Sequence, residues 1–266
     1  MKRVLGIALA SMLMLGTMGM TAMAEENNSV KVYVTISDDK GSLVMTQEEV
    51  TVTDVDGDGA LTINDALYVA HEAKYEGGAE AGYTSYMSDY GMSMSKLWGI
   101  ENGGSYGYCV NNASALSLVD AVKEGDYINA YAYTDLTAWS DTYSYFDVYI
   151  TNAEAGAEFT LTLSANGYDS SWNPIVIPVA NATITVNGEE TEFVTDAEGK
   201  VTIALEKGGT YIISATSEEM TLVPPVCTAM IEGEPSDTNI TVVVIVAFVA
   251  VIAIAGIILL GVKKRK

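Results

Sequence analysis

The sequence predicts an α+β head domain followed by an all-β sandwich, with one transmembrane helix at the C-terminal end. In residues 28–150, alternating apolar and polar residues indicate β-strands, and one stretch has the spacing of an amphipathic helix. Residues 157–222 contain short strand patterns separated by turn sequences, which is typical of a β-sandwich. Residues 240–262 carry no charge over 23 positions, enough at about 1.5 Å per residue to cross a hydrocarbon core of roughly 30 Å.

The two ends of the chain predict an exported protein anchored in a membrane. Residues 1–24 have the features of a signal peptide, because two basic residues precede an apolar run and Ala22-Met23-Ala24 has the small-x-small pattern of a cleavage site. The basic tail, residues 263–266, places the C-terminus in the cytoplasm and the ectodomain outside the cell. A buried core helix is the alternative for residues 240–262, but so long an apolar run has no face suited to water. Residues 223–239, with a Pro-Pro pair and several acids, predict a stiff acidic stalk.

The charge balance excludes one class of partner. Six of the 13 basic residues lie in the predicted signal peptide and tail, which leaves seven against all 35 acidic residues. The ectodomain therefore has a net charge near −28 and contains no Arg. Such a surface repels nucleic acid and anionic lipid and attracts cations. We expect no nucleic-acid partner, and contact with the membrane through the single span alone.

The head begins with a predicted hairpin and helix. Strands are expected over Val30–Ile36 and Val44–Val52, with a turn at residues 38–42. The helix is expected over Ala66–Tyr75, and its apolar face is formed by Ile63, Ala66, Leu67, Ala70 and Ala73. His71, the only histidine, is expected at the boundary of that face in a structural role, since no partner has the spacing of a zinc site or a catalytic triad.

Between the hairpin and the helix lies an acidic loop, residues 54–65, that reads D-V-D-G-D-G-A-L-T-I-N-D. A twelve-residue calcium loop places its ligands at positions one, three, five, seven, nine and twelve. Here these positions hold Asp54, Asp56, Asp58, Ala60, Thr62 and Asp65. Gly59 at position six permits the required backbone, and Leu61 at position eight can point into a core. A solvated acidic turn is the alternative, but four carboxylates in register favour Ca²⁺ as the bound ion.

The loop and the following helix resemble one repeat of a dockerin, which also ends its calcium loop in Asp. The resemblance covers about twenty residues. Dockerins use two such repeats to bind a cohesin, whereas residues 38–41 and 196–199, the nearest candidates for a second repeat, lack the spaced acids. Cohesin binding is therefore kept as an alternative function.

The middle of the head is rich in aromatic residues. Residues 76–104 show no clear period and predict either a long ordered loop or a helical excursion, and strands are expected over residues 107–112 and 123–133. Fourteen of the 16 tyrosines fall between Tyr33 and Tyr149. A face that binds a small molecule or a protein is predicted from Trp98, Tyr106, Tyr108, Tyr131 and Tyr133. The alternative is that these rings belong to the core.

The order of an opening strand, a hairpin, a helix, an aromatic strand ending in V-N-N (residues 110–112) and the sequence K-E-G-D-Y-I (residues 123–128) resembles the DUF4430 family. This family is a β-grasp-like module related to the C-terminal domain of transcobalamin and intrinsic factor. The resemblance covers residues 28–150 and implies a β-grasp-like head. The Trp usual near Tyr108 and the Gly usual at Asn112 are missing, and the calcium loop is inserted before the helix. In the vitamin carriers this domain closes over cobalamin with a large helical domain that is absent from this sequence.

After a short linker at residues 151–156, a regular series of strand patterns predicts the sandwich. Strong hairpin turns are expected at Asn187-Gly188 and at residues 196–199. The sequence resembles carboxypeptidase-regulatory-like and bacterial immunoglobulin-like spacer domains, which implies no chemistry of its own. The expected strands are Phe159–Ala165, Ile175–Val179, Thr183–Val186, Thr191–Val194, Val201–Leu205 and Tyr211–Ala215.

These features together predict a calcium-binding, membrane-anchored cell-surface protein that captures a ligand or mediates adhesion, and that is not an enzyme. The motif H-E-x-x-H and the P-loop are both missing. A purely structural spacer is the main alternative, and a glycosidase-like carboxylate pair is a further one, because such a pair is recognised by distance in the fold. Cys109 and Cys227 are expected in different domains, with two free thiols favoured over a disulfide.

Overall fold

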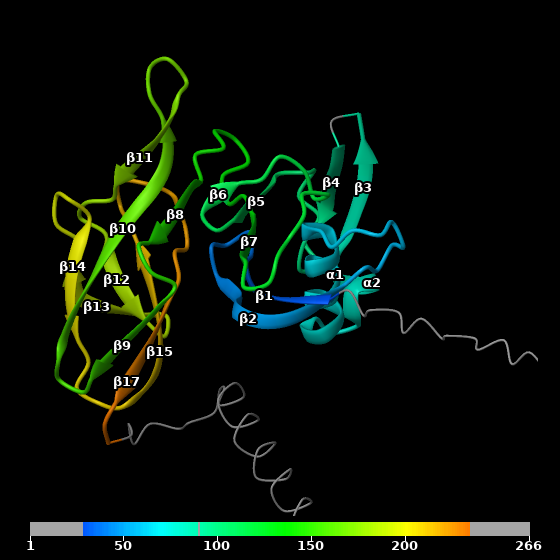
Figure 1. Cartoon of the computed structure of the whole chain (residues 1–266). Helices are drawn as coiled ribbons and strands as arrows, with labels where there is room; N and C mark the ends of the chain where they lie inside the picture. Colours follow the sequence, from blue (N-terminus) through cyan, green and yellow to red (C-terminus); the bar gives the residue numbers. More distant parts are fainter. Residues whose placement is uncertain (1–28, 90, 235–266) are drawn as a thin grey trace, which may run out of the picture.

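A computed structural model describes residues 29–89 and 91–234 of the protein. The structure is mostly β-sheet with few helices, and it forms two units that lie side by side (Figure 1). The predicted signal peptide, the end of the predicted stalk, the apolar segment 240–262 and the basic tail lie outside the described residues. Among the residues that are described, no helix has both the length and the apolar character needed to cross a membrane.

The first unit is built on a five-stranded sheet in the order β2-β1-β7-β5-β6. Strands β1 and β2 form the expected antiparallel hairpin, β7 runs parallel to β1, and β5 is antiparallel to β7. The parallel neighbour β7 is brought beside β1 by the connection that contains the helices and the β3–β4 hairpin. The strands are β1 (Ser29–Ser37), β2 (Leu43–Thr53), β5 (Tyr106–Val110), β6 (Ala113–Ser114) and β7 (Tyr127–Ala132).

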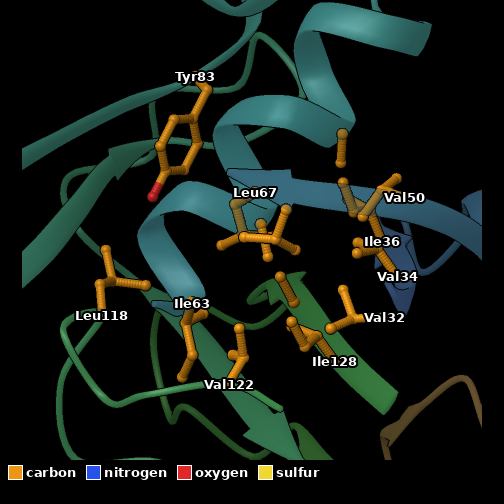
Figure 2. Packing of buried hydrophobic residues seen from close by; sticks show 14 of the residues in the cluster. Val32, Val34, Ile36, Val50, Ile63, Leu67, Tyr83, Leu118, Val122 and Ile128 are labelled. Carbon is orange, nitrogen blue, oxygen red and sulfur yellow. The ribbon is translucent and has the colours of Figure 1, made fainter. Parts of the chain in front are cut away.

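One helix covers this sheet and forms the core with it (Figure 2). Helix α1 (Ile63–Lys74) begins three residues earlier than the sequence suggests, and it buries Ile63, Ala66, Leu67 and Ala70 against the sheet. Ala73, expected on the same face, is exposed in the last turn of the helix, which ends at Lys74. Alternate residues of β1 point toward the helix and are fully buried, namely Val32, Val34 and Ile36.

Residues 76–104 form neither of the two expected structures alone. They contain a short helix, α2 (Gly78–Gly82), followed by a two-stranded hairpin of β3 (Thr84–Ser88) and β4 (Gly91–Lys96). This segment covers the end of α1: Leu97 and Met94 belong to the core cluster, and Trp98 packs against it. The absence of a sequence period is explained by the shortness of these elements.

The second unit is a β-sandwich of two sheets, one in the order β11-β10-β8-β16 with β14 also paired to β10, the other in the order β13-β12-β15-β17-β9. Apolar residues from both sheets form one core cluster, among them Leu161, Leu163, Ile184 and Ile213. All six strands expected from the sequence are present, as are the turns at Asn187-Gly188 and residues 196–199. They are β10 (Glu158–Tyr168), β11 (Pro174–Pro178), β12 (Thr183–Val186), β13 (Glu189–Val194), β14 (Lys200–Ala204) and β15 (Gly209–Thr216).

The sandwich extends beyond both limits expected from the sequence. Strands β8 (Thr142–Phe146) and β9 (Ile150–Glu154), which fall in the expected head and linker, pair with β10 and β17. Strands β16 (Leu222–Val223) and β17 (Cys227–Glu232), at the end of the expected spacer and within the expected stalk, pair with β8 and β15. These pairings join residues that are far apart in sequence, and two of the pairings are parallel. No local sequence pattern therefore predicts them.

The two units are joined by a specific polar contact. Gln47 lies at an irregularity in the β1–β2 pairing with φ of 45°, and its side chain crosses to the sandwich. The Gln47 Nε2 group donates to the backbone oxygens of Tyr149 and Val226 at 3.2 and 3.4 Å, and its Oε1 accepts from Thr228 at 2.6 Å. Beside it, the rings of Tyr127 and Tyr149 stack at a centroid distance of 3.7 Å.

The two cysteines are free and buried, so the alternative of a disulfide between them is wrong. Cys109 packs with Tyr131, Tyr143 and Val223, whereas Cys227 belongs to the sandwich core. Burial raises the pKa of each thiol to about 12. Neither thiol is a nucleophile at neutral pH, because the reactive form is the thiolate.

Candidate functional site

The acidic loop connects the end of β2 to the start of α1 and is folded around its own carboxylates. Oxygen atoms of Asp54, Asp56 and Asp58 lie within 4.8 Å of one another, and all three residues are exposed. Gly57 and Gly59 adopt φ of 77° and 87°, the left-handed region in which a side chain is disfavoured. The chain can therefore turn back on itself and aim successive carboxylates at one point.

Backbone amides and neighbouring charges act on these carboxylates in opposite directions. Asp54 accepts from the N–H groups of Gly59, Gly57 and Asp58 at 2.8, 2.7 and 3.2 Å, and these bonds lower its pKa. The pKa of Asp56 is raised, first by its partial removal from water and then by the charges of Asp58, Asp65 and Asp54. At neutral pH the loop thus concentrates negative charge at one point, which is the environment that a hard cation stabilises.

The end of the loop is also the N-terminal cap of α1. Thr62 is the N-cap residue, and its hydroxyl donates to Oδ2 of Asp65 at 2.6 Å while accepting from the Asp65 N–H at 3.3 Å. Oδ2 of Asp65 also accepts from the Thr62 N–H at 2.8 Å, and Oδ1 accepts from Val55 N–H at 3.0 Å. Since a carboxylate has about four lone-pair positions, these three hydrogen bonds leave one position of Asp65 unused.

The loop is fastened to the core of the head. Leu61, at position eight, is buried as expected, and its carbonyl accepts from the N–H of Val122 at 2.9 Å. Ile63 N–H donates to the carbonyl of Asp120 at 3.1 Å. Figure 2 shows Val122 and Leu118 beside Ile63 at the start of α1. The loop is therefore held on one side by packing and on the other by its glycines and carboxylates.

The structure places the six predicted metal residues unequally. Asp54, Asp56 and Asp58 converge, and Ala60, at position seven, follows with its N–H bonded to Asp58 at 2.8 Å. Asp65 is fully buried and lies outside the cluster of three. The hydroxyl of Thr62 is used in the helix cap, so position nine would act through a water molecule, as it often does in such loops.

The five aromatic residues predicted to bind a ligand do not line one groove. Trp98 packs against His71 and Tyr75 at the end of α1, each at a centroid distance of 5.2 Å. Tyr106 and Tyr108 pack against the core on the helix side of the sheet. Tyr131 and Tyr133 belong to a separate cluster with Cys109 and Tyr143. The reason is the strand register: Tyr131 is opposite Gly107, so it lies on the face opposite to that of Tyr106 and Tyr108.

Two of these residues do border an open depression of about 150 Å³. Tyr106 and Tyr108 form one side of it and Tyr86, Ser93 and Met94 of the β3–β4 hairpin form the other. The Tyr106 hydroxyl is used within the fold, where it lies 2.9 Å from the Ser95 carbonyl and 2.8 Å from that of Ile100. Of the five aromatic residues predicted to bind a ligand, Tyr106 and Tyr108 line the depression, and Trp98, Tyr131 and Tyr133 do not.

His71 is fully buried, which corrects its expected position at the boundary of the helix. Its Nδ1 donates to the Leu67 carbonyl at 2.6 Å, because Nε2 must accept the N–H of Trp98 at 3.0 Å. Burial lowers the pKa of His71 to about 4. Tyr75, Tyr83 and Trp98 surround the ring, and Tyr83 and Trp98 come from a segment whose fold the sequence does not define.

Sequence analysis missed two exposed tryptophans in loops of the sandwich, Trp139 and Trp172. Each follows an Asp by three or four residues, and Asp is a residue whose side chain often organises a turn. The spacing between Asp and Trp was the signal that could have found them. Gln47 was also missed, and the sequence contains no signal for its role.

Comparison with known proteins gives no family for this chain. No family model matches it, and no curated protein matches its sequence. Among solved structures, the four N-terminal immunoglobulin domains of Dscam1 isoform 7.44 are similar at 10% identity with a TM-score of 0.23. The match covers 40% of this chain and 23% of that chain.

Proposed function

We propose that this protein is a calcium-binding, membrane-tethered cell-surface module that works by binding and not by catalysis. The observation that carries the proposal is the convergence of Asp54, Asp56 and Asp58 within 4.8 Å in a loop whose two glycines are left-handed. The spacing of the loop and its capping box with Asp65 support Ca²⁺ over a solvated turn. The ion would stabilise the connection between β2 and α1 by binding the folded loop only.

Export and a single C-terminal span belong to the same proposal. Their support is the sequence alone: the signal-like residues 1–24, the uncharged residues 240–262 and the basic residues 263–266. In the described residues, β17 ends at Glu232, only a few residues before the apolar segment. The sandwich would therefore stand close to the membrane surface, with the head joined to it through Gln47.

The β-grasp-like head of the DUF4430 family is part of the proposal. It is supported by one helix packed on a mixed sheet in which β1 and β7 run parallel. Ligand capture by the head is supported by Tyr106 and Tyr108 only, at the open depression beside the β3–β4 hairpin.

Thermal unfolding of the full chain in a neutral detergent tests calcium binding. With about 10 mM Ca²⁺ and dissociation constants of about 10⁻⁴–10⁻³ M, the ion adds about 1.4–2.7 kcal/mol to the free energy of unfolding. We expect a higher melting temperature in Ca²⁺ than in chelator, and no such shift in the double variant Asp54→Asn, Asp58→Asn. The matched control, Asp39→Asn with Glu76→Gln, removes two exposed charges outside the loop and should keep the shift. Equal melting temperatures in Ca²⁺ and chelator would disprove the proposal.

A further inference from the structure

The two exposed tryptophans of the sandwich lie at the same end of one sheet. Strand β8 begins at Thr142, directly after the loop of residues 134–141, and pairs antiparallel with the last part of β10. The β10–β11 hairpin turn, residues 169–173, follows that part of β10. Figure 1 shows this hairpin projecting from the end of the sandwich opposite to the end at which β17 finishes. Both loops thus point away from the C-terminal end of the unit.

Each tryptophan is held in a backbone conformation that a bulky residue normally avoids. Trp139 has φ of 51° and Trp172 has φ of 62°, both in the left-handed region where Gly or Asn is the usual choice. Their side chains are 64% and 82% exposed, so burial does not compensate for this conformation. A large ring kept at a strained and exposed position is a feature that folding alone does not explain.

Both loops are rigid because an Asp carboxylate organises each of them. Asp135 accepts the N–H groups of Thr137 and Ala138 at 2.9 and 3.0 Å, and its backbone oxygen accepts the Trp139 N–H at 3.1 Å. Asp169 accepts the N–H groups of Ser171 and Asn173 at 2.8 and 2.9 Å, and its backbone oxygen accepts the Trp172 N–H at 3.0 Å. A similar arrangement therefore fixes the backbone at both tryptophans.

The loops that carry the rings contain no basic residue, and their only charged residues are Asp135, Asp141 and Asp169. Residues 159–188 contain one charged residue, Asp169, and residues 124–199 contain no Lys or Arg. The carboxylates of Asp135 and Asp169 accept hydrogen bonds within their own loops. In Asp135 these bonds lower the pKa to about 2. A third aromatic residue, Tyr168, is 62% exposed, and the centroid of its ring lies 6.1 Å from that of Trp172 at an interplanar angle of 49°.

We propose that Trp139, Tyr168 and Trp172 form a binding surface for a neutral polysaccharide. The π-face of an aromatic ring is negative and attracts the C–H faces of sugar rings, and Trp and Tyr give large contact area at low entropic cost. Without a basic residue nearby, the surface has no partner for sulfate, uronate or phosphate groups. Insertion into an anionic bilayer is disfavoured for the same reason. This surface lies in the sandwich, and it goes beyond the proposed calcium function of the head.

Affinity electrophoresis of the full chain in neutral detergent tests the proposal. The gels contain, one at a time, hydroxyethyl cellulose, mixed-linkage β-glucan, galactomannan or starch, and heparin serves as the anionic comparison. We expect at least one neutral polymer to retard the protein and heparin not to do so. Each of Trp139→Gly and Trp172→Gly should weaken that binding by about tenfold, and the double variant should abolish it.

Glycine is chosen because it relieves the left-handed backbone, so these variants should fold at least as well as the native chain. The control Leu116→Ala removes a side chain that is 92% exposed in the head and should bind as the native protein does. Binding should persist in chelator, which separates this surface from the calcium loop. Lack of retardation by all four neutral polymers, or equal retardation of the double variant, would overturn the proposal. Tryptophan-dependent flotation with phosphatidylcholine vesicles in place of polysaccharide binding would also overturn it.

Discussion

The head and the sandwich differ in the surroundings of their ionisable side chains. In the head, three carboxylates converge at the acidic loop and one imidazole is buried without a counter-ion. In the sandwich, the carboxylates of Asp135 and Asp169 are each surrounded by N–H donors of their own loops. Carboxylates that stand apart and accept local N–H groups organise turns, whereas carboxylates that converge also repel one another, which a bound cation would relieve. Between pH 7 and pH 4, the stability of the head should therefore depend on pH and calcium more strongly than that of the sandwich, whose lowered Asp135 pKa matters only at more acidic pH.

The largest expected effect is on the pH dependence of the head. The pKa of His71 is about 4 when folded and 6.5 when unfolded, so the unfolded state binds a proton that the folded state excludes. The stability that neutral His71 provides is complete above pH 6.5 and is lost as the pH falls toward 4, by about 3 kcal/mol. Protonation would also set an N–H on Nε2 against the N–H of Trp98.

Denaturant unfolding between pH 7 and pH 4, in chelator, measures this loss. The His71→Gln variant is less stable at pH 7, but its stability should fall less steeply over that range. The amides of β10, in the sandwich core, serve as the internal control, and their protection from hydrogen exchange relative to pH-corrected rates should change less. A native protein with the same slope as the variant would show that His71 does not titrate in this way.

An intermediate effect is expected at the joint between the two units. The Gln47→Gly change removes all three hydrogen bonds that the side chain makes with the sandwich, which should cost about 2 kcal/mol. Calorimetry should then show a lower unfolding midpoint, while the packing of Cys109 and Tyr131 against Tyr143 and Val223 still joins the units. Gln47→Ala should be lower still in stability, because it keeps a side chain at φ of 45°. An unchanged midpoint would mean that the Gln47 side chain does not stabilise the joint.

The smallest effect is expected at the tryptophan loops and has the opposite sign. Replacing Trp139 or Trp172 by Gly should raise the free energy of unfolding by about 0.5–1 kcal/mol, since the left-handed strain is relieved and no buried contact is lost. Leu116→Gly, at an exposed position without positive φ, should lower it by a similar amount. A loss of stability in both tryptophan variants would show that the rings support the sandwich.

The sequence predicted well those features that depend on neighbours along the chain. The six central sandwich strands and the Asn187-Gly188 turn follow from period and turn chemistry, and Thr183–Val186 was predicted to the residue. The convergence of Asp54, Asp56 and Asp58 follows from their spacing and from Gly59. In each case the interacting groups are at most about a dozen residues apart.

Features that depend on distant pairing could not be predicted in this way. Strands β8 and β9 were not predicted, because their places beside β10 and β17 are set by the whole sandwich. The aromatic residues illustrate the same limit. Alternation places Tyr106 with Tyr108 and Tyr131 with Tyr133, but only the β5–β7 register shows that the two pairs lie on opposite faces. His71 is buried because the segment after α1 folds over it.

Titration calorimetry of the full chain with Ca²⁺ tests the central claim most directly. The account predicts one site per chain with a dissociation constant of about 10⁻⁴–10⁻³ M, and no binding heat for the variant Asp54→Asn, Asp58→Asn. Binding should also weaken as the pH falls through the raised pKa of Asp56, because protons then compete for the loop. No heat with the native protein, or the same heat with the double variant, would contradict the assignment of residues 54–65 as a calcium site.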